Sequence, residues 1–516
     1  MDTPVVHADG RTLTPQEVAM VANQKAKVAV SEDAWPGIHA ARRVVERIVS
    51  EGETVYGINT GFGALVHERI SVDDLAQLQV NLIRSHATAI GDLMSVEAVR
   101  AMMLIRLNSL CKGHSGIHPD CIRQLVVYLN QGIHPAVPRI GSLGASGDLA
   151  PLSHLAMALI GEGFVLVDGE KRPTGEVLFE QGLVPVELTA KDGLSLINGT
   201  SQMTAYATLA YTQLTHLLVM ADAVLAMSMD ARSCSLTPSR PEVHDVRPHP
   251  GQALVAERLR TLLSGSEILA GHAGCDRVQD PYSFRCAPQV HGAVYESYLR
   301  LGDMITKEMN SATDNPLIFP EPSNPGPHEV VSQGNFHGEI VALTCDAMSL
   351  ALFELGSISE RRMDQMLDPA RSDLPAFLAR DSGLESGLMI VQYVAGAALA
   401  ELHGQATPRA AFSTSTSAGQ EDHVSMGATA AWNLYHGVRR LAEIIACEAL
   451  IGAEALEHAT LPSSDHVQGL HSLLRNVAPA LTGDRSTSDE LLDIASCVVD
   501  GGWLARMEAE HGRLPR

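Results

Sequence analysis

The chain has 516 residues, of which 45% are apolar and 19% are charged, so it can bury a large core and is too apolar for a disordered protein. The net charge of −23 argues against a nucleic-acid partner, because a phosphate backbone requires a basic face. Eight scattered cysteines without a C-x-x-C pair, and no apolar signal core between Met1 and Lys27, predict a cytoplasmic protein with reduced thiols. The longest nearly uncharged run, about Ala205 to Ala221, is too short and too polar to predict a membrane span.

Glycine-rich loops and one hairpin mark the first part of the chain. Tyr56-Gly-Ile-Asn-Thr-Gly-Phe-Gly63 and Gly141-Ser-Leu-Gly-Ala-Ser-Gly-Asp148 each contain three glycines, which permit positive φ angles and close backbone approaches. The segment Phe164 to Asp168, with a turn at Asp168-Gly169, predicts one arm of a small hairpin. Other strand signals are few and short.

Long helical patterns dominate the second part. Four windows have apolar residues at helical spacing and few prolines: Ala205–Asp230, Val341–Leu367, Ile390–Gly404 and Ala428–Ala455. The predicted fold is therefore mainly α, a bundle of long helices with short strands and with glycine-rich active-site loops in the N-terminal part. Residues 1–200 carry both loops, and residues 201–516 form the long-helix bundle and the C-terminal helices. We expect the two parts to pack as one unit.

Several common motifs are incomplete. Gly144 to Asp148 resembles the G-x-S-x-G turn of serine hydrolases, but Asp148 stands where that pattern requires glycine. Gly61-Phe-Gly63 lacks the third glycine of a dinucleotide fingerprint. No H-E-x-x-H or four-cysteine spacing occurs, so no metal site is expected.

The tripeptide Ala145-Ser146-Gly147 can react with itself. If the Gly147 nitrogen attacks the Ala145 carbonyl carbon, a five-membered ring closes and one water leaves. Loss of the Ser146 hydroxyl as a second water creates an exocyclic methylidene, and the product is the electrophile methylidene-imidazolone. An amide nitrogen is a poor nucleophile, so the loop must hold the reacting atoms close together. Glycine leaves that nitrogen unobstructed, serine supplies the leaving hydroxyl, and alanine is small enough for a compressed turn.

The motifs around this tripeptide resemble the histidine/phenylalanine/tyrosine ammonia-lyase family, and its histidine branch in particular. They occur in family order between Tyr56 and Met426. Besides the two glycine-rich loops, with the second extending to His154, they are Asn198-Gly-Thr200, Val278-Gln-Asp-Pro-Tyr-Ser-Phe-Arg-Cys286, Gly334-Asn-Phe-His337 and Gln420-Glu-Asp-His-Val-Ser-Met426. The resemblance implies a self-formed electrophile without an external cofactor, and a homotetramer whose active sites are shared between chains.

The resemblance also implies roles for the residues that handle the amino acid head group. Tyr56 is the expected base; because an unperturbed tyrosine has a pKa of about 10, its pKa must be shifted or it must act as a phenolate near positive charge. Arg285 suits the substrate carboxylate, which a guanidinium binds through two parallel hydrogen bonds. Asn198, Gln279 and Tyr282 are expected to line the electrophile and the head group. Asn198 is expected to donate a hydrogen bond to the ring oxygen, as in an oxyanion hole.

Further residues are placed by the same motifs. Phe336 is expected to pack beside the electrophile, and Asn335 and Gln420 are expected to contact the substrate. Asp148 either helps the ring to close or caps the helix that follows it.

Two residues indicate which side chain the substrate carries. His86, in Ser85-His86, matches the histidine-branch position that meets the side chain, and Glu421 stands where phenylalanine and tyrosine lyases usually have glutamine. A carboxylate can pair with an imidazolium or accept its N–H, so L-histidine, converted to trans-urocanate, is the expected substrate.

Other residues favour a different aromatic substrate. Asn81-Leu-Ile-Arg-Ser-His86 and Asn198 to Thr204 look closer to tyrosine lyases and aminomutases, and Ala287 and Ala400-Glu-Leu-His403 depart from the usual histidine-lyase pattern. A tyrosine or phenylalanine ammonia-lyase, or an aminomutase that returns ammonia to the β-carbon, therefore stays open. The alternatives from other classes are a serine hydrolase using Ser146 and a helical scaffold with a dead site.

Overall fold

The structure, a computed structural model, describes residues 3–53, 55, 57–58, 70–71, 74–272, 278–320 and 329–516. The chain forms two compact units. Unit 1 contains Met1–Leu209, Leu301–Asp346 and Pro408–Trp432, and unit 2 contains Ala210–Arg300, Ala347–Thr407 and Asn433–Arg516. The chain first passes from unit 1 to unit 2 near the expected division at residue 200, but each unit is assembled from three separate segments. This arises because four long helices each contribute residues to both units: α9 (Ser201–Ala231), α14 (Ala287–Glu308), α15 (Glu339–Leu367) and α18 (Gly427–Leu456).

The mainly helical prediction is confirmed. The four predicted long helices occur close to their predicted bounds, as α9, α15, α17 (Met389–Gln405) and α18. The further helices of unit 1 are α1 (Pro15–Ala22), η1 (Glu32–Ala34), α2 (Trp35–Glu51), α3 (Leu75–His86), α4 (Val96–Cys111), α5 (Pro119–Gln131), α6 (Leu149–Leu159), α7 (Thr174–Glu180), α8 (Asp192–Ile197) and η6 (Ser417–Gly419). Those of unit 2 are η4 (Thr237–Ser239), α10 (Pro241–Asp245), α11 (Pro250–Leu262), α12 (Glu267–Gly271), α13 (Tyr282–Arg285), α16 (Pro369–Ser372), η5 (Ala376–Leu378), α19 (Asp465–Arg475), α20 (Ser488–Asp500) and α21 (Gly502–His511).

The described strands all lie in unit 1 and form small sheets. Strands β1 (Val5–Ala8) and β2 (Lys27–Val30) pair in parallel, and the other pairs are antiparallel. These are β3 (Ile90–Leu93) with β5 (Pro138–Ile140), β4 (His134–Pro135) with β6 (Phe164–Val167) and β7 (Glu170–Pro173), and β8 (Leu317–Ile318) with β9 (Val330–Val331). The predicted hairpin is confirmed as β6–β7. Its two-residue turn places Asp168 at φ 50° and Gly169 at φ 83°, the left-handed geometry that tight hairpins require.

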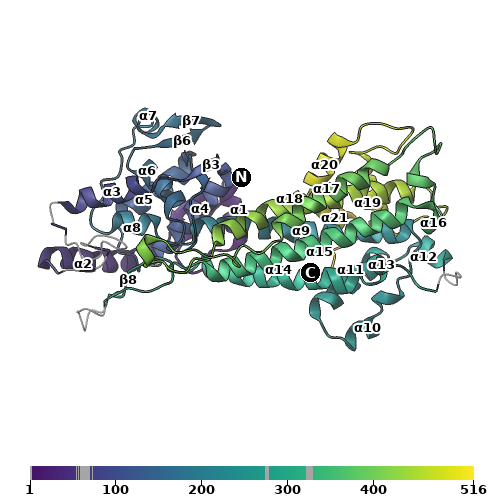
Figure 1. The fold of residues 1–516 in the computed structure, drawn as a ribbon, viewed down its shortest axis with the longest axis horizontal. Coiled ribbons are helices and arrows are strands. Elements are labelled where there is room, and N and C mark those ends of the chain that lie inside the picture. Colours follow the sequence, from purple (N-terminus) through teal and green to yellow (C-terminus); the bar gives the residue numbers. More distant parts are fainter. Residues whose placement is uncertain are drawn as a thin grey trace. The chain divides into compact units, whose positions relative to one another are not determined.

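Buried charges join the long helices of unit 2, which lie side by side (Figure 1). Arg362 on α15 is fully buried and forms two hydrogen bonds with Glu448 on α18, at 2.5 and 2.7 Å. Arg362 also donates to the ring of His291 on α14 at 3.4 Å, and that ring contacts Asp222 on α9 at 2.7 Å. The carboxylate of Asp222 is paired in turn with Arg258 on α11 at 2.6 Å. Each of these buried charged side chains therefore has a partner of opposite charge, as burial demands.

Helices α9 and α15 are long and apolar enough to cross a membrane by length and composition alone. In the structure, 83% of the most apolar window of α9 and 50% of that of α15 are buried inside the protein. The burial of α9 is that of a core helix in a bundle.

We predict that Arg362→Leu lowers the free energy of unfolding by about 3–5 kcal/mol, because it leaves the Glu448 carboxylate buried without its partner. The matched control is Arg371→Leu, which breaks an ion pair with Asp364 at the surface of the same unit and should cost less than about 1 kcal/mol. Chemical denaturation of both variants measures the difference. Equal decreases in the free energy of unfolding would show that the buried ion pair stabilises the bundle no more than a surface pair does.

Candidate active site

A cavity of about 1240 Å³ in unit 1 brings together most of the site residues predicted from the sequence. Its walls come from α3, the loop that follows β5, α8, the segment before α15, and the turn around η6. Among its lining residues are His86, Ala145, Ser146, Asn198, Phe336, Gln420 and Glu421. Segments far apart in the sequence therefore meet around Ser146.

The loop that carries Ala145, Ser146 and Gly147 is held against a second glycine turn. Gly147 has φ 73° and forms a backbone bridge with Gly199, and the Asp148 N–H donates to the Gly199 carbonyl at 2.8 Å. A Cβ atom on Gly147 would lie 2.2 Å from the Gly199 oxygen, so no other residue fits. The glycine predicted to supply the attacking nitrogen is thus also required by packing.

The other side of this loop is held by hydrogen bonds to residues far along the chain. The Leu143 carbonyl accepts from the Met426 N–H at 2.9 Å, and the Gly144 carbonyl accepts from the Gly338 N–H at 3.1 Å. Within the loop, the Ser142 hydroxyl lies 2.8 Å from an Asp148 oxygen and 3.2 Å from the Gly147 carbonyl. A loop fixed at this many points can hold the Gly147 nitrogen near the Ala145 carbonyl, as ring closure requires.

Asn198 contacts the backbone oxygen that matters most for the predicted electrophile. Its side-chain Nδ2 donates to the Ser146 carbonyl oxygen at 2.7 Å. If Gly147 nitrogen closes a ring onto the Ala145 carbon, the Ser146 carbonyl is the one that remains, and its oxygen becomes the ring oxygen. The residues therefore fit the group: a donor is already aimed at the atom on which negative charge would develop.

The Ser146 hydroxyl, which would leave as water, donates to Glu421 Oε1 at 3.0 Å. The second carboxylate oxygen of Glu421 accepts from the Thr416 hydroxyl at 3.0 Å, and Thr416 and Glu421 also pair through their backbones. The turn between them is strained, since Ser417 and Ala418 have φ 51° and 53°, a region that costs a non-glycine residue of the order of 1–2 kcal/mol. This strained turn presents Glu421 to the cavity.

A backbone hydrogen bond orients the His86 ring. Its Nδ1 lies 2.8 Å from the Leu82 carbonyl, which can only accept, so Nδ1 carries a proton, and Nε2 is the acceptor for a ligand when the ring is neutral. Burial lowers the pKa of His86, while the Leu82 carbonyl and the Glu421 carboxylate oppose that shift. His86 and Glu421 are thus both among the side chains of this cavity that can bind a ligand through hydrogen bonds.

Asp148 does not cap the helix that follows it, contrary to one of the two expectations. It makes no side-chain hydrogen bond to α6. Its Oδ2 instead accepts from the N–H groups of Gln202 and Met203, at 2.7 and 3.2 Å, in the first turn of α9. The carboxylate turns toward α9 because the Gly147–Gly199 contact brings that helix start beside it. Burial raises the pKa of Asp148 to about 7, against the lowering effect of its hydrogen bonds.

Some of the remaining predicted site residues of unit 1 line the cavity and others do not. Phe336 and Gln420 line the cavity. Asn335 is exposed next to Phe336, and its side chain donates to the Ala312 carbonyl at 3.4 Å rather than lining the cavity. Tyr56 lies outside the described residues. No group of three or more His, Cys, Asp or Glu side chains suited to a metal ion occurs in the described part of the chain.

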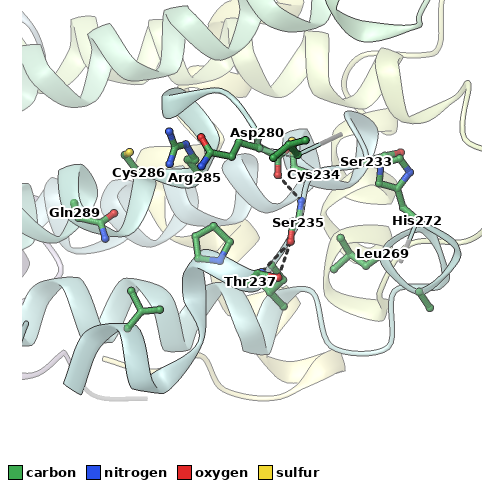
Figure 2. A pocket seen from close by; sticks show the side chains of 16 residues that line it. Ser233, Cys234, Ser235, Thr237, Leu269, His272, Asp280, Arg285, Cys286 and Gln289 are labelled. Carbon is green, nitrogen blue, oxygen red and sulfur yellow. Dashed lines mark hydrogen bonds between the residues drawn. The ribbon is translucent and has the colours of Figure 1, made fainter. Parts of the chain in front are cut away.

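Gln279, Tyr282 and Arg285 belong to unit 2, where Gln279 and Arg285 line a separate cavity of about 1010 Å³ (Figure 2). The Arg285 guanidinium lies over the Tyr282 ring, 4.5 Å from its centroid. Arg285 Nε is buried and has no hydrogen-bond partner among the described residues, so it has donor capacity for a ligand. Tyr282 is 70% exposed and Val278 is 94% exposed, although both belong to the motif that resembles an active-site segment.

Comparison with known proteins decides the family. The model of the aromatic amino acid lyase family matches residues 13–476. This chain is a member of the aromatic amino acid lyase family. It is 44% identical to histidine ammonia-lyase of Deinococcus radiodurans over 98% of this chain and 96% of that protein. The solved structure of histidine ammonia-lyase from Trypanosoma cruzi has a TM-score of 0.90 and 39% identity, covering 98% of this chain and 95% of that one. Tyrosine aminomutase from Streptomyces globisporus has a TM-score of 0.93 and 35% identity, covering 99% and 100%.

Three residues around the lyase site were not singled out from the sequence. Ser142 stood inside a recognised motif, but only the fold shows that its hydroxyl joins Gly147 to Asp148. Thr416 precedes Glu421 by five residues, and nothing in that spacing indicates the turn between them. Arg106 donates to the backbone carbonyl of Asn198, and the sequence carries a signal for it, since it is a charge among the apolar residues Met102 to Leu107.

Asp148 yields a pH prediction. Because its pKa is raised above the ordinary value of 3.8, ionisation opposes folding, and the stability it contributes is lost as the pH rises from about 4 through about 7. Thermal unfolding compares Ser146→Ala with Ser146→Ala/Asp148→Asn, neither of which can form the electrophile. The melting temperature of the first variant should fall relative to that of the second as the pH rises from about 4 to about 7. A difference that is constant, or that changes the other way, would show that the hydrogen bonds to Asp148 outweigh its burial.

Proposed function

We propose that this chain is an ammonia-lyase that eliminates ammonia from L-histidine to give trans-urocanate, with an electrophile formed from Ala145, Ser146 and Gly147. The observation that carries the proposal is the 2.7 Å hydrogen bond from Asn198 Nδ2 to the Ser146 carbonyl oxygen, inside a loop that only glycine at position 147 permits. A methylidene-imidazolone at this place supplies an electron-poor carbon that captures the substrate and turns a poor leaving group into a better one.

The chain's own residues supply the rest of the chemistry. Asn198 holds the ring oxygen and stabilises charge on it. Tyr56, on the strength of its motif, removes the β-proton, and Phe336 covers one wall of the cavity. Arg285 binds the substrate carboxylate with its planar donors.

The geometry around Glu421 supports histidine as the substrate. When the Ser146 hydroxyl is lost, Glu421 Oε1 loses the hydrogen bond that this hydroxyl donates. The other oxygen, Oε2, keeps its hydrogen bond from the Thr416 hydroxyl. Maturation therefore frees one carboxylate oxygen in the cavity, and His86 Nε2 supplies a second acceptor there. A neutral imidazole offers one N–H donor and one ring-nitrogen acceptor, and an imidazolium offers two N–H donors and a positive charge that pairs with Glu421; a phenol offers one O–H donor, and a phenyl ring offers none.

The proposed enzyme is a homotetramer with shared active sites. Support comes from the exposed apolar side chains of α15 and α17, among them Ile340 (56% exposed), Leu343 (54%), Ile390 (56%) and Tyr393 (66%). Further support is the exposure of Val278 and Tyr282, since a catalytic motif open to solvent in one chain is suited to completing the cavity of another. We also propose that the enzyme is cytoplasmic, since all described cysteines are free.

The direct test is incubation of purified protein with histidine, tyrosine and phenylalanine, without added metal or nucleotide. The proposal predicts free ammonia and an ultraviolet-absorbing conjugated acid, with histidine turned over fastest. Faster turnover of tyrosine would replace the substrate but keep the lyase chemistry. A β-amino acid as the main product would identify an aminomutase, and absence of both products would reject the proposal.

The Glu421→Gln variant tests the role of the free carboxylate oxygen. It should lower kcat/KM for histidine by about 10- to 100-fold, because a hydrogen bond to a charged group is worth about 1.5–3 kcal/mol. The control is Glu180→Gln, which changes an exposed carboxylate that pairs with Arg172 and does not line the cavity, and it should leave kcat/KM within about 3-fold of wild type. If Glu421→Gln matched this control, the imidazole would not bind at Glu421.

A further inference from the structure

A buried arginine donates hydrogen bonds to the backbone carbonyls of Asn198 and of a residue just before it. Arg106, on α4, is fully buried. Its NH1 donates to the Asn198 carbonyl at 2.8 Å, and its NH2 donates to the Ser195 carbonyl. Both carbonyls lie at the C-terminal end of α8, where helical carbonyls lack partners within the helix and a positive charge is favourable. Arg106 therefore closes the end of the helix that leads into the active site.

The other end of α8 is fixed as well. Gln79, a fully buried residue on α3, accepts from the Gly193 N–H at 2.8 Å. Asp192, at the start of α8, accepts from the His118 N–H at 2.7 Å and pairs with Arg42 at 3.2 Å. With both ends held, α8 forms a rigid base for the residue that follows it.

The side chain of Asn198 has few contacts of its own to fix its direction. Its Nδ2 donates to the Ser146 carbonyl, and its Oδ1 is buried with no hydrogen-bond partner among the described residues. The following residue, Gly199, passes directly over the guanidinium, since a Cβ atom there would lie 2.5 Å from Arg106 NH1. The position of the Asn198 amide is therefore set by its backbone, and that backbone is held by Arg106.

We propose that Arg106 is a positioning residue that aligns the Asn198 amide with the oxygen of the self-formed electrophile. This inference rests on the proposed function, because that function makes the Ser146 carbonyl the ring oxygen. Arg106 does not line the cavity, and its hydrogen bonds go to the backbone of Ser195 and Asn198 rather than to the tripeptide, so its effect on the electrophile passes through Asn198. Burial lowers the pKa of Arg106 to about 10, which leaves the guanidinium charged at neutral pH and able to hold both carbonyls.

The chain offers a matched control on the same helix. Arg100 is also buried on α4 and also holds two backbone carbonyls, those of Val21 at 2.7 Å and Leu129 at 2.9 Å. Neither of these residues lines the cavity. Arg106→Lys and Arg100→Lys therefore make the same chemical change, and only the first affects a carbonyl next to the electrophile.

The experiment compares wild type, Arg106→Lys, Arg100→Lys, Asn198→Ala and Arg106→Lys/Asn198→Ala. The first readout is the ultraviolet absorbance of the electrophile, whose maximum responds to the hydrogen bond on its ring oxygen. We expect Arg106→Lys to shift this maximum in the same direction as Asn198→Ala, and the double variant to shift it no further than Asn198→Ala alone. The second readout is turnover, where Arg106→Lys should lower kcat by about 10-fold or more with KM within about 3-fold, and should add less than about 2-fold to Asn198→Ala.

The outcomes separate the two hypotheses. Additive effects in the double variant, or an Arg106→Lys enzyme that matches Arg100→Lys in absorbance and kcat, would overturn the positioning role while the lyase function stands. A wild-type protein with neither the absorbance nor ammonia release would overturn the proposed function, and this inference with it. If Arg106→Lys yields no soluble protein, Arg106→Gln, which keeps an uncharged NH2 donor group, takes its place under the same criteria.

Discussion

The close contact between Gly147 and Gly199 is the constraint on which the rest of the site depends. With no room for a Cβ atom between them, the two backbones meet directly, and the Asp148 N–H bonds to the Gly199 carbonyl. This contact fixes the tripeptide loop against the start of α9, where the Ser146 carbonyl oxygen lies 2.7 Å from the Asn198 amide nitrogen. The proximity needed for ring closure and the donor needed for catalysis therefore come from one packing arrangement.

Two buried side chains hold this arrangement at the ends of helices. Asp148 faces the first N–H groups of α9, and Arg106 faces the last carbonyls of α8. The positive charge of Arg106 lies where the helix dipole favours it, whereas burial raises the pKa of Asp148 to about 7, so Asp148 acts at the start of α9 through its hydrogen bonds. The glycine turn between α8 and α9 thus lies between two fixed hydrogen-bonding side chains, which limits how far Asn198 can move.

The parts of the fold that could be predicted from the sequence are those set by local patterns. The long helices follow from apolar spacing, and the β6–β7 hairpin follows from the Asp168-Gly169 turn. The residues of the cavity were found through motif resemblance, and the structure brings His86, Ser146, Asn198 and Glu421 together around it. What local patterns could not supply are contacts between distant segments. The turn of Asp148 toward α9 requires the Gly147–Gly199 contact, and the role of Arg106 depends on α4 packing beneath α8.

The central claim is that Ala145, Ser146 and Gly147 close into a ring and lose two water molecules. The most direct measurement is the mass of the proteolytic peptide that contains Gly141 to Asp148, taken from freshly purified protein and from Ser146→Ala. The wild-type peptide should be lighter than its sequence mass by two waters, and the variant peptide should not show the second loss because it has no hydroxyl to eliminate. A wild-type peptide at its full sequence mass, from protein that releases ammonia, would contradict the self-formed electrophile.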